Sequence, residues 1–293
     1  MKISELIRAY GLVRIVEVTP PRYQINFSVT VRQLRLRMYS WLEMVRRMSL
    51  YCDAIAIADL KETEACHVPP ALLARELKRE GGIEPMPSIA LRDYSKGALL
   101  NVVVGCLNVD IRNLLVVRGD PHKKGEGLEG DLFGFKRVAD ALREIRRLVG
   151  EGDQAPLCLA TALDHRMSQE EEYVEVLRQR EKLVDFYVAQ PFFMPPERYL
   201  ELIDDLKSKG IRKPILHSIF PLLSQEDIEV VTKRFGWTIS EEERKKVSEG
   251  PGAGIELAAM KFDYLLKNKG RVAGVYVSSR NRPELIRLVM SAR

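Results

Sequence analysis

The stretch Val16-Glu17-Val18-Thr19-Pro20-Pro21-Arg22 decides how the fold is read, together with a second stretch, Leu115-Val116-Val117-Arg118-Gly119-Asp120-Pro121. In both, an apolar run rich in β-branched residues ends in charged residues followed by proline. Such a run is typical of a buried parallel strand that ends in a functional loop. Because α/β folds bind ligands at the carboxyl ends of their strands, Glu17 and Asp120 are the first candidate functional residues.

Strand-like and helix-like segments alternate along the chain. Strands are predicted at 13–18, 53–58, 86–91, 112–118, 156–161, 184–190, 213–219 and 271–278. Helices are predicted at 29–50, 69–80, 94–106, 133–149, 168–182, 195–209, 224–235 with 255–268, and 283–291. The helices are indicated by apolar residues at three- and four-residue spacing, by proline or serine at their starts and by glycine after their ends.

This alternation predicts an α/β fold, a single-domain (β/α)8 TIM barrel over residues 1–293. The Gly-rich and charged segment 236–254 is predicted to elaborate the seventh loop and helix. An open doubly wound sheet is the alternative. It is disfavoured because no G-x-G-x-x-G follows the first strand.

The composition favours a globular protein that acts on small molecules. Hydrophobic residues make up 46% and charged residues 30%, and basic residues exceed acidic ones by only 46 − 41 = 5. This small excess is spread along the chain, which argues against nucleic acid. The four cysteines and four histidines lack metal-ligand spacing, so no metal site is predicted. With no signal-peptide pattern and no apolar run of about 20 residues, we expect a cytoplasmic protein without membrane contact.

The predicted strand ends offer groups for proton transfer, for phosphate binding and for stacking a planar ring. The candidates are Glu17 after strand one, Arg118, Gly119 and Asp120 after strand four, His165 after strand five, Gln190 and Phe192 after strand six, and Asn281 after strand eight. Each has a structural alternative. Glu17 could pair with an arginine, Asp120 could cap the turn before Pro121, and Phe192 could belong to the core.

Taken together, the strand ends resemble those of the 5,10-methylenetetrahydrofolate reductase family, flavin-dependent barrel enzymes of one-carbon metabolism and methionine biosynthesis. Glu17 to Arg22 resembles the family's E-x-x-P-P-R, and Arg118 to Pro121 resembles its R-G-D-P. Ala189 to Phe193 resembles T-Q-x-F-F, Gly254 to Glu256 matches G-I-E, and Asn281-Arg282 matches a late N-R. The motifs occur in the family's order and cover essentially the whole chain.

The resemblance implies an oxidoreductase that reduces 5,10-methylenetetrahydrofolate, or a related methylene-tetrahydropterin, to the 5-methyl form through reduced FAD. It implies that Glu17 protonates N10 of the folate as the ring opens, and that Asp120 controls the flavin potential. NAD(P)H would be the electron donor, and a homo-oligomer is expected. The implied flavin contacts are Arg118, Gly119, Asp120, Phe133, Gly134, His165 and Arg178, and the implied substrate contacts are Gln190, Phe192 and Asn281.

Several positions depart from the family pattern. Ala58, Ser88, Thr161 and Gln179 stand where the family has flavin-contacting residues, and Asp227 and Val231 stand where some members contact the nicotinamide. Three hypotheses therefore remain open. The first is a flavin-dependent reductase, and the second is a reductase that takes electrons from another donor or a redox partner protein, or that works without flavin. The third is a non-catalytic pterin-binding subunit. The sequence also leaves open whether the pterin is folate or a modified carrier.

Overall fold

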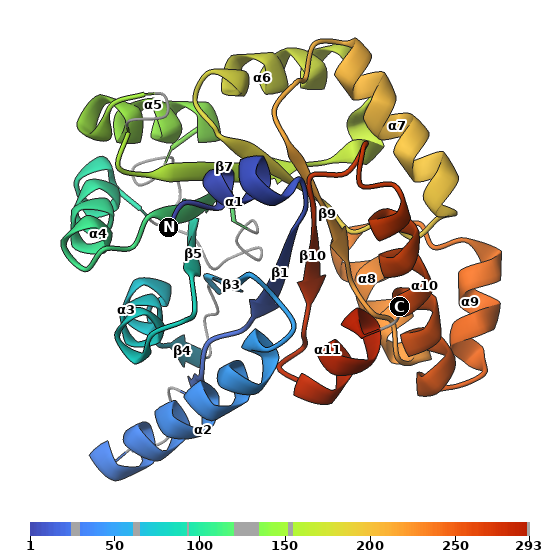
Figure 1. Cartoon of the computed structure of the whole chain (residues 1–293), viewed down its shortest axis with the longest axis horizontal. Helices are drawn as coiled ribbons and strands as arrows, with labels where there is room; N and C mark the ends of the chain where they lie inside the picture. Colours follow the sequence, from blue (N-terminus) through green and yellow to red (C-terminus); the bar gives the residue numbers. More distant parts are fainter. Residues whose placement is uncertain (25–29, 61–64, 93, 120–134, 152–154, 292–293) are drawn as a thin grey trace.

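Eight parallel strands close into a barrel that is surrounded by helices (Figure 1), and the predicted (β/α)8 fold is thereby confirmed. The computed structural model describes residues 1–24, 30–60, 65–92, 94–119, 135–151 and 155–291. The strands pair in the order β1-β10-β9-β8-β7-β6-β5-β3, with β3 closing on β1. They are β1 (Val13–Val18), β3 (Ala54–Ile57), β5 (Pro85–Ala90), β6 (Asn113–Val117), β7 (Cys158–Leu163), β8 (Phe186–Ala189), β9 (Ile215–Ile219) and β10 (Gly274–Ser278).

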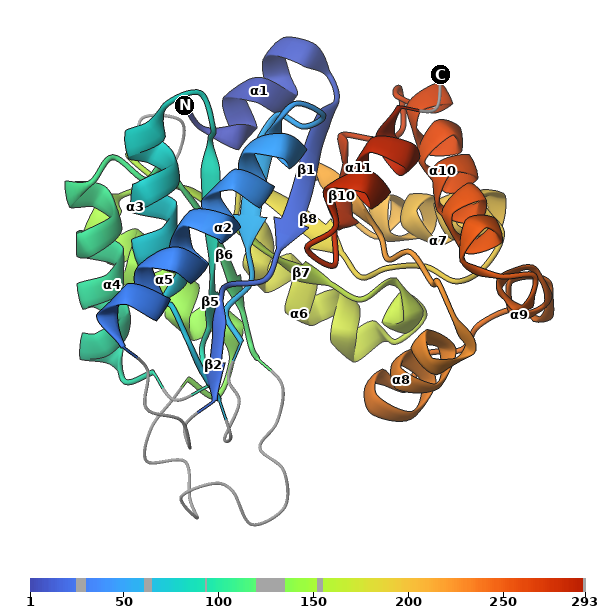
Figure 2. The same ribbon diagram turned by 90° about the horizontal axis from the view of Figure 1, so that it is seen from below.

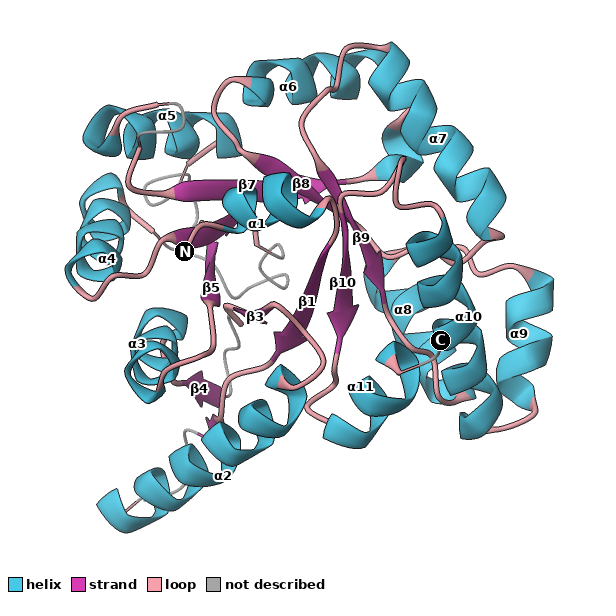
Figure 3. Ribbon diagram, in the orientation of Figure 1, coloured by secondary structure: helices cyan, strands magenta, loops and turns pink. Residues whose placement is uncertain are grey.

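The helices lie on the outside of the barrel, as Figure 3 shows by colour. They are α2 (Val31–Ser49), α3 (Pro70–Glu80), α4 (Lys96–Asn108), α5 (Val138–Val149), α6 (Glu171–Glu181), α7 (Pro196–Ser208), α8 (Gln225–Phe235), α9 (Glu241–Ser248), α10 (Pro251–Lys267) and α11 (Pro283–Met290). Their apolar faces pack on the outward residues of the strands to form the main core. Within the described residues, none of the helices combines the length and apolar character that a membrane crossing needs.

Helix α1 (Ile3–Tyr10), which the sequence reading did not include, closes the amino end of the barrel. Its residues Ile3, Leu6 and Ile7 join the cluster of side chains that fills the barrel interior. The Ile3 N–H donates to Asn113 Oδ1 at the start of β6, at 2.7 Å. A helix this short is unstable alone, so burial against the barrel stabilises it.

Segment 236–254 contains α9 and the start of α10, which begins at Pro251 rather than at 255. Figure 2 shows α8, α9 and α10 side by side at one flank of the barrel. Gly254 lets α10 approach the loop after β9, because a Cβ there would lie 1.9 Å from the carbonyl oxygen of Leu222. The sequence reading also did not include the short antiparallel pair of β2 (Arg22–Gln24) and β4 (Ala65–His67) beside the barrel mouth.

Candidate active site

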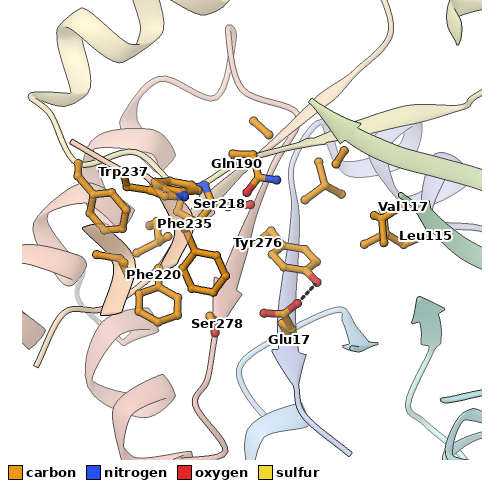
Figure 4. Close-up of a pocket in the computed structure, with 17 residues that line it drawn as sticks. Glu17, Leu115, Val117, Gln190, Ser218, Phe220, Phe235, Trp237, Tyr276 and Ser278 are labelled. Atoms are coloured by element: carbon orange, nitrogen blue, oxygen red, sulfur yellow. Dashed lines mark hydrogen bonds between the residues drawn. The ribbon is translucent and has the colours of Figure 1, made fainter. Parts of the chain in front are cut away.

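A cavity of about 250 Å³ lies at the carboxyl ends of the barrel strands (Figure 4). Four aromatic side chains line one side of it: Phe193, Phe220, Phe235 and Trp237. Glu17 and Tyr276 lie on the opposite side. The other polar side chains among the described lining residues are Gln190, Ser218 and Ser278. The cavity therefore suits a flat, mostly apolar ring that is held by a few polar contacts.

Glu17 reaches the cavity because of the two-residue period of β1. Val13 and Ile15 belong to the barrel interior, and Glu17 continues the same inward row. Val16 and Val18 face outward, into the core under the helices. The alternation that fills the barrel thus places one carboxyl group at its mouth.

The electrostatic surroundings of Glu17 favour its protonated form. Burial raises the pKa of its carboxyl group, and hydrogen bonds from Tyr276 and Ser278 only partly oppose that effect. The Tyr276 hydroxyl donates to Glu17 Oε1 at 2.8 Å. No cationic side chain among the described residues contributes to this pKa. Glu17 therefore keeps a proton to higher pH than an exposed glutamate, which suits a general acid.

A second cavity of about 480 Å³ adjoins the first and shares Val117, Ala162 and Gln190 with it. Its wall includes four basic residues: Arg118, Lys136, Arg137 and Arg180. Val138 and Ala139 also line it, so the amino end of α5 contributes to the wall. The positive end of a helix and several basic side chains together favour an anionic ligand.

Arg180 is the most informative residue of this second cavity. Its Nε is buried and has no hydrogen-bond partner among the described residues, and Nη1 only approaches Ala162 O at 3.4 Å. No carboxylate in the described part of the chain pairs with it. Burial lowers the pKa of the guanidinium. Because a half-buried guanidinium with an unsatisfied Nε and no carboxylate partner is unfavourable, this site favours binding of an anion.

Besides Glu17, two of the predicted site residues line a cavity, and a third, Gly119, directly follows one of them in the chain. Gln190 lines both cavities, and Arg118 lines the basic one. Gly119 has φ 84°, and a Cβ there would lie 3.2 Å from the Cβ atoms of Ala90 and Arg92, so the loop backbone passes close to its neighbours. The other predicted residues of this loop, Asp120, Phe133 and Gly134, lie outside the described residues.

Two predicted residues are buried behind the cavity wall. Phe192 stacks on Tyr199 with ring centroids 4.0 Å apart, and His165 meets the same tyrosine edge-on at 4.9 Å. Phe192 is 2% exposed and His165 is 1% exposed. Phe193, the next residue, lines the cavity in place of Phe192. These positions support the core alternative for Phe192.

Two further predicted residues make contacts within the protein. Asn281 links the loops after β10 and β1, because its Oδ1 accepts from Thr19 N–H at 2.9 Å and its Nδ2 donates to Thr19 Oγ1 at 2.7 Å. Arg178 forms ion pairs with Glu171 and Glu175 on the exposed side of α6. Arg180, two residues further along the same helix, is the one that lines the basic cavity.

Sequence reasoning missed Tyr276, Arg180 and Trp237. Tyr276 had a readable signal, since it lies two residues before Ser278 in a predicted strand and therefore faces the same side. Arg180 and Trp237 had none, because one lies in a helix rich in charged residues and the other in a loop.

Two buried histidines predict acid sensitivity of the fold. Burial is the main cause that lowers the pKa of His165 to about 4 and that of His217 to about 3. The unfolded chain binds these protons near pH 6.5, so stability is full above that pH and falls as the pH drops towards 4 and then 3. Each histidine should contribute a slope of about 1.4 kcal/mol per pH unit in that window.

Urea unfolding between pH 7 and pH 4.5 measures this slope. His165→Phe, which keeps a ring beside Tyr199, should flatten the slope by about one proton's share. An unchanged slope in that variant would contradict the buried neutral state of His165.

No group of three or more metal-ligating side chains occurs within the described ranges. In the described part of the barrel mouth, the carboxyl group of Glu17, with its raised pKa, lies in a cavity lined by aromatic side chains, and a basic cavity adjoins it. The fold and this site define a (β/α)8 barrel protein with a buried carboxyl group, an aromatic cavity and a basic cavity at the carboxyl ends of its strands. The chain belongs to the methylenetetrahydrofolate reductase family, because the sequence model of that family, "Methylenetetrahydrofolate reductase", matches residues 12–291.

Among individual proteins, "Methylenetetrahydrofolate reductase 2" of Schizosaccharomyces pombe is 21% identical over 240 residues, 74% of this chain. The alignment covers 37% of the yeast protein, which is much longer. An uncharacterized protein from Clostridium thermocellum that binds two copies of 5-methyl-5,6,7,8-tetrahydrofolic acid has a similar structure, with TM-score 0.67, 15% identity, and coverage of 99% of this chain and 100% of its own.

The EDTA monooxygenase of Chelativorans sp. BNC1 is more distant in structure. It gives TM-score 0.53 and 10% identity, and the alignment covers 96% of this chain and 93% of that one. At these identities the structural likenesses establish the shared barrel fold.

Proposed function

We propose that this protein is an oxidoreductase that reduces 5,10-methylenetetrahydrofolate, or a related methylene-tetrahydropterin, to the 5-methyl form. The observation that carries the proposal is Glu17, a carboxyl group with a raised pKa in an otherwise apolar and aromatic cavity. Membership of the methylenetetrahydrofolate reductase family supports the reaction class. The Clostridium protein, which binds the methylated product of this reaction, supports the ligand class.

The chain's own residues supply proton transfer and orientation. Opening of the five-membered ring requires a proton on the leaving N10, and Glu17, whose pKa is raised by burial, is the group at the cavity wall suited to supply it. Tyr276 donates a hydrogen bond to Oε1 of the same carboxyl group, which fixes its orientation. The aromatic wall and Gln190 hold the pterin ring, and the apolar lining excludes water from the iminium that forms. Asp120, as the electrostatic partner of the flavin, stays a prediction from the family resemblance.

The basic cavity fits the phosphates of FAD. Arg180 carries an unpartnered buried Nε there, Arg118 lies at the wall and the amino end of α5 adds its dipole. A reduced flavin bound beside Gln190 would supply a hydride to the one-carbon unit. Phe133 and Gly134 are proposed as further contacts by resemblance, whereas the position of Arg178 points to Arg180 as the phosphate ligand.

Replacing Arg180 by Met should weaken FAD binding by about ten- to a hundredfold, because it removes a charge-assisted contact to phosphate and keeps the volume of the side chain. Equilibrium titration with FAD, followed by flavin absorbance, measures the affinity. Arg178→Met, on the same helix but outside the cavity, is the matched control and should bind FAD as the unchanged chain does. Equal weakening by both variants would contradict this placement of the phosphates.

One observation favours an electron donor other than NAD(P)H. Asp227 is engaged within the protein, since its carboxylate accepts from Leu223 N–H at 2.8 Å and pairs with Arg280. It is therefore poorly placed to hold a nicotinamide. We propose that electrons reach the flavin from another reductant, such as a redox partner protein. Fast flavin reduction by NADH in a stopped-flow experiment would argue against this.

The deciding experiment incubates the purified protein with chemically reduced FAD and 5,10-methylenetetrahydrofolate and measures 5-methyltetrahydrofolate by chromatography. The proposal expects catalytic formation of the methyl product. Binding of the pterin without turnover would identify a pterin-binding subunit instead. The homo-oligomer and the cytoplasmic location stay predictions, to be checked by sedimentation and by fractionation.

A further inference from the structure

Trp237 occupies a defined place in the cavity wall although it lies in a loop. Helix α8 ends at Phe235, and Gly236 caps it in a left-handed conformation, with φ 63°. The chain then reverses direction. The backbone N–H of Trp237 donates to the carbonyl oxygen of Val231 at 3.2 Å. The indole ring meets the ring of Phe193 edge-on, with centroids 5.1 Å apart. Backbone and ring contacts therefore fix the direction of the indole.

Arg166 holds the indole from outside the cavity. Its Cζ lies 4.6 Å from the centroid of the Trp237 ring, a cation–π contact. The same guanidinium donates from Nε to Asp164 Oδ1 at 2.9 Å and from Nη2 to Asp164 Oδ2 at 2.6 Å, a bidentate pair. Its Nη1 reaches the carbonyl of Gly236 at 3.3 Å. The arginine thus joins the loop after β7 to the loop after α8.

A second wall residue has the same kind of support. Arg280 lies over the ring of Phe220, with Cζ 5.7 Å from the centroid, and pairs with Asp227. Neither Arg166 nor Arg280 is among the described lining residues of the cavity, while Trp237 and Phe220 are. Each cation therefore lies on the far side of an aromatic ring, and neither belongs to the described lining of the cavity.

This support also connects the two cavities. Asp164, which orients Arg166, lines the basic cavity, and Trp237 lines the aromatic one. A chain of contacts from Asp164 through Arg166 to Trp237 therefore joins the basic cavity to the aromatic one. The pair is only partly exposed, with side-chain exposure of 36% for Arg166 and 20% for Asp164, so it is less screened than a surface pair.

From these contacts we infer that Trp237 is the stacking residue for the uncharged ring of the substrate, and that Asp164 and Arg166 act as positioning residues for it. The inference rests on the proposed function for the identity of the ring, a reduced pterin or its attached aryl group. An anionic tail would stay outside the cavity, because no cation among the described residues lines it.

Calorimetric titration with 5-methyltetrahydrofolate tests the stacking contact. Trp237→Leu should weaken binding by about tenfold, since it removes the stacked aromatic contact while keeping an apolar side chain. Trp237→Phe keeps a ring and should stay within about threefold of the unchanged chain. Equal affinity of the leucine variant and the unchanged chain would overturn the stacking role.

The positioning role needs a separate readout. The chain has two tryptophans, so Trp41→Phe leaves Trp237 as the single indole reporter. In that background Arg166→Met should increase quenching of Trp237 by acrylamide and weaken binding, and Arg166→Lys, which keeps a cation over the ring, should restore part of both. Unchanged quenching in the methionine variant would overturn the positioning role.

Turnover of the unchanged chain separates this inference from the proposed function. Product formation with undiminished binding in Trp237→Leu would refute the stacking role alone. Weakened binding in that variant without any turnover by the unchanged chain would refute the reductase proposal and support the stacking role. Failure of the unchanged chain to bind 5-methyltetrahydrofolate would overturn both.

Discussion

Replacing Glu17 by Gln is expected to slow methylene reduction by about a hundred- to ten-thousandfold, the usual contribution of a general acid. Glutamine keeps the shape of the side chain and its Oε1 can still accept the hydrogen bond from Tyr276, but it has no acidic proton to give. Binding of FAD and of the pterin should change little, because the basic cavity and the aromatic wall are untouched. Single-turnover measurements with reduced enzyme isolate this step.

The pH dependence of methylene reduction is an independent test of the role of Glu17. Activity that needs a protonated Glu17 is present at low pH and is lost as the pH rises through the pKa of Glu17, which burial has raised. The hydrogen bond from Tyr276 lowers that pKa, so Tyr276→Phe should move the falling limb of the profile to higher pH. Near-normal turnover in Glu17→Gln, or a Tyr276→Phe profile shifted to lower pH, would remove Glu17 from this role.

Replacing Lys261 by Met alone is expected to destabilise the protein by about 3–5 kcal/mol, because it leaves a buried charge unpaired. Lys261 on α10 lies 2.8 Å from Glu243 Oε1 on α9, and both side chains are 5% exposed. The ammonium also donates to Phe192 O at 2.8 Å. The pair therefore fastens the segment 236–254 to the loop that carries Gln190 and Phe193. Urea unfolding followed by circular dichroism measures the loss.

The double variant Lys261→Met with Glu243→Leu should recover most of that loss, since two apolar side chains of similar volume can replace a buried ion pair. Recovery should stop about 1 kcal/mol short, because the Phe192 carbonyl loses its donor. Glu243→Leu alone should be as damaging as Lys261→Met. A double variant whose loss equals the sum of the two single losses would show that the ion pair is not the source of the effect.

The sequence was enough to predict the barrel and the position of Glu17 at its mouth. The β-branched runs, spaced by amphipathic helices with proline starts and glycine ends, define eight β/α units, and eight such units close on themselves. Glu17 was predicted because it lies at the carboxyl end of the first β-branched run, and the structure places it in line with Val13 and Ile15 on the inward face. The barrel and the position of Glu17 can be predicted because their patterns are local and are contained within single segments of the sequence.

Tertiary contacts decided what each loop residue does. Phe192 and Phe193 are equivalent in the sequence, yet packing on Tyr199 buries the first and leaves the second in the cavity wall. Arg178 and Arg180 lie on different faces of the same helix. Arg178 therefore pairs with exposed glutamates, whereas Arg180 lines the basic cavity. Trp237 meets Arg166 across 71 residues of chain, 237 − 166, a distance over which no local pattern acts. The sequence by itself therefore determined the scaffold and the place of Glu17 at its mouth. Only the folded chain decided which side chains surround Glu17, because those contacts join segments far apart in the sequence.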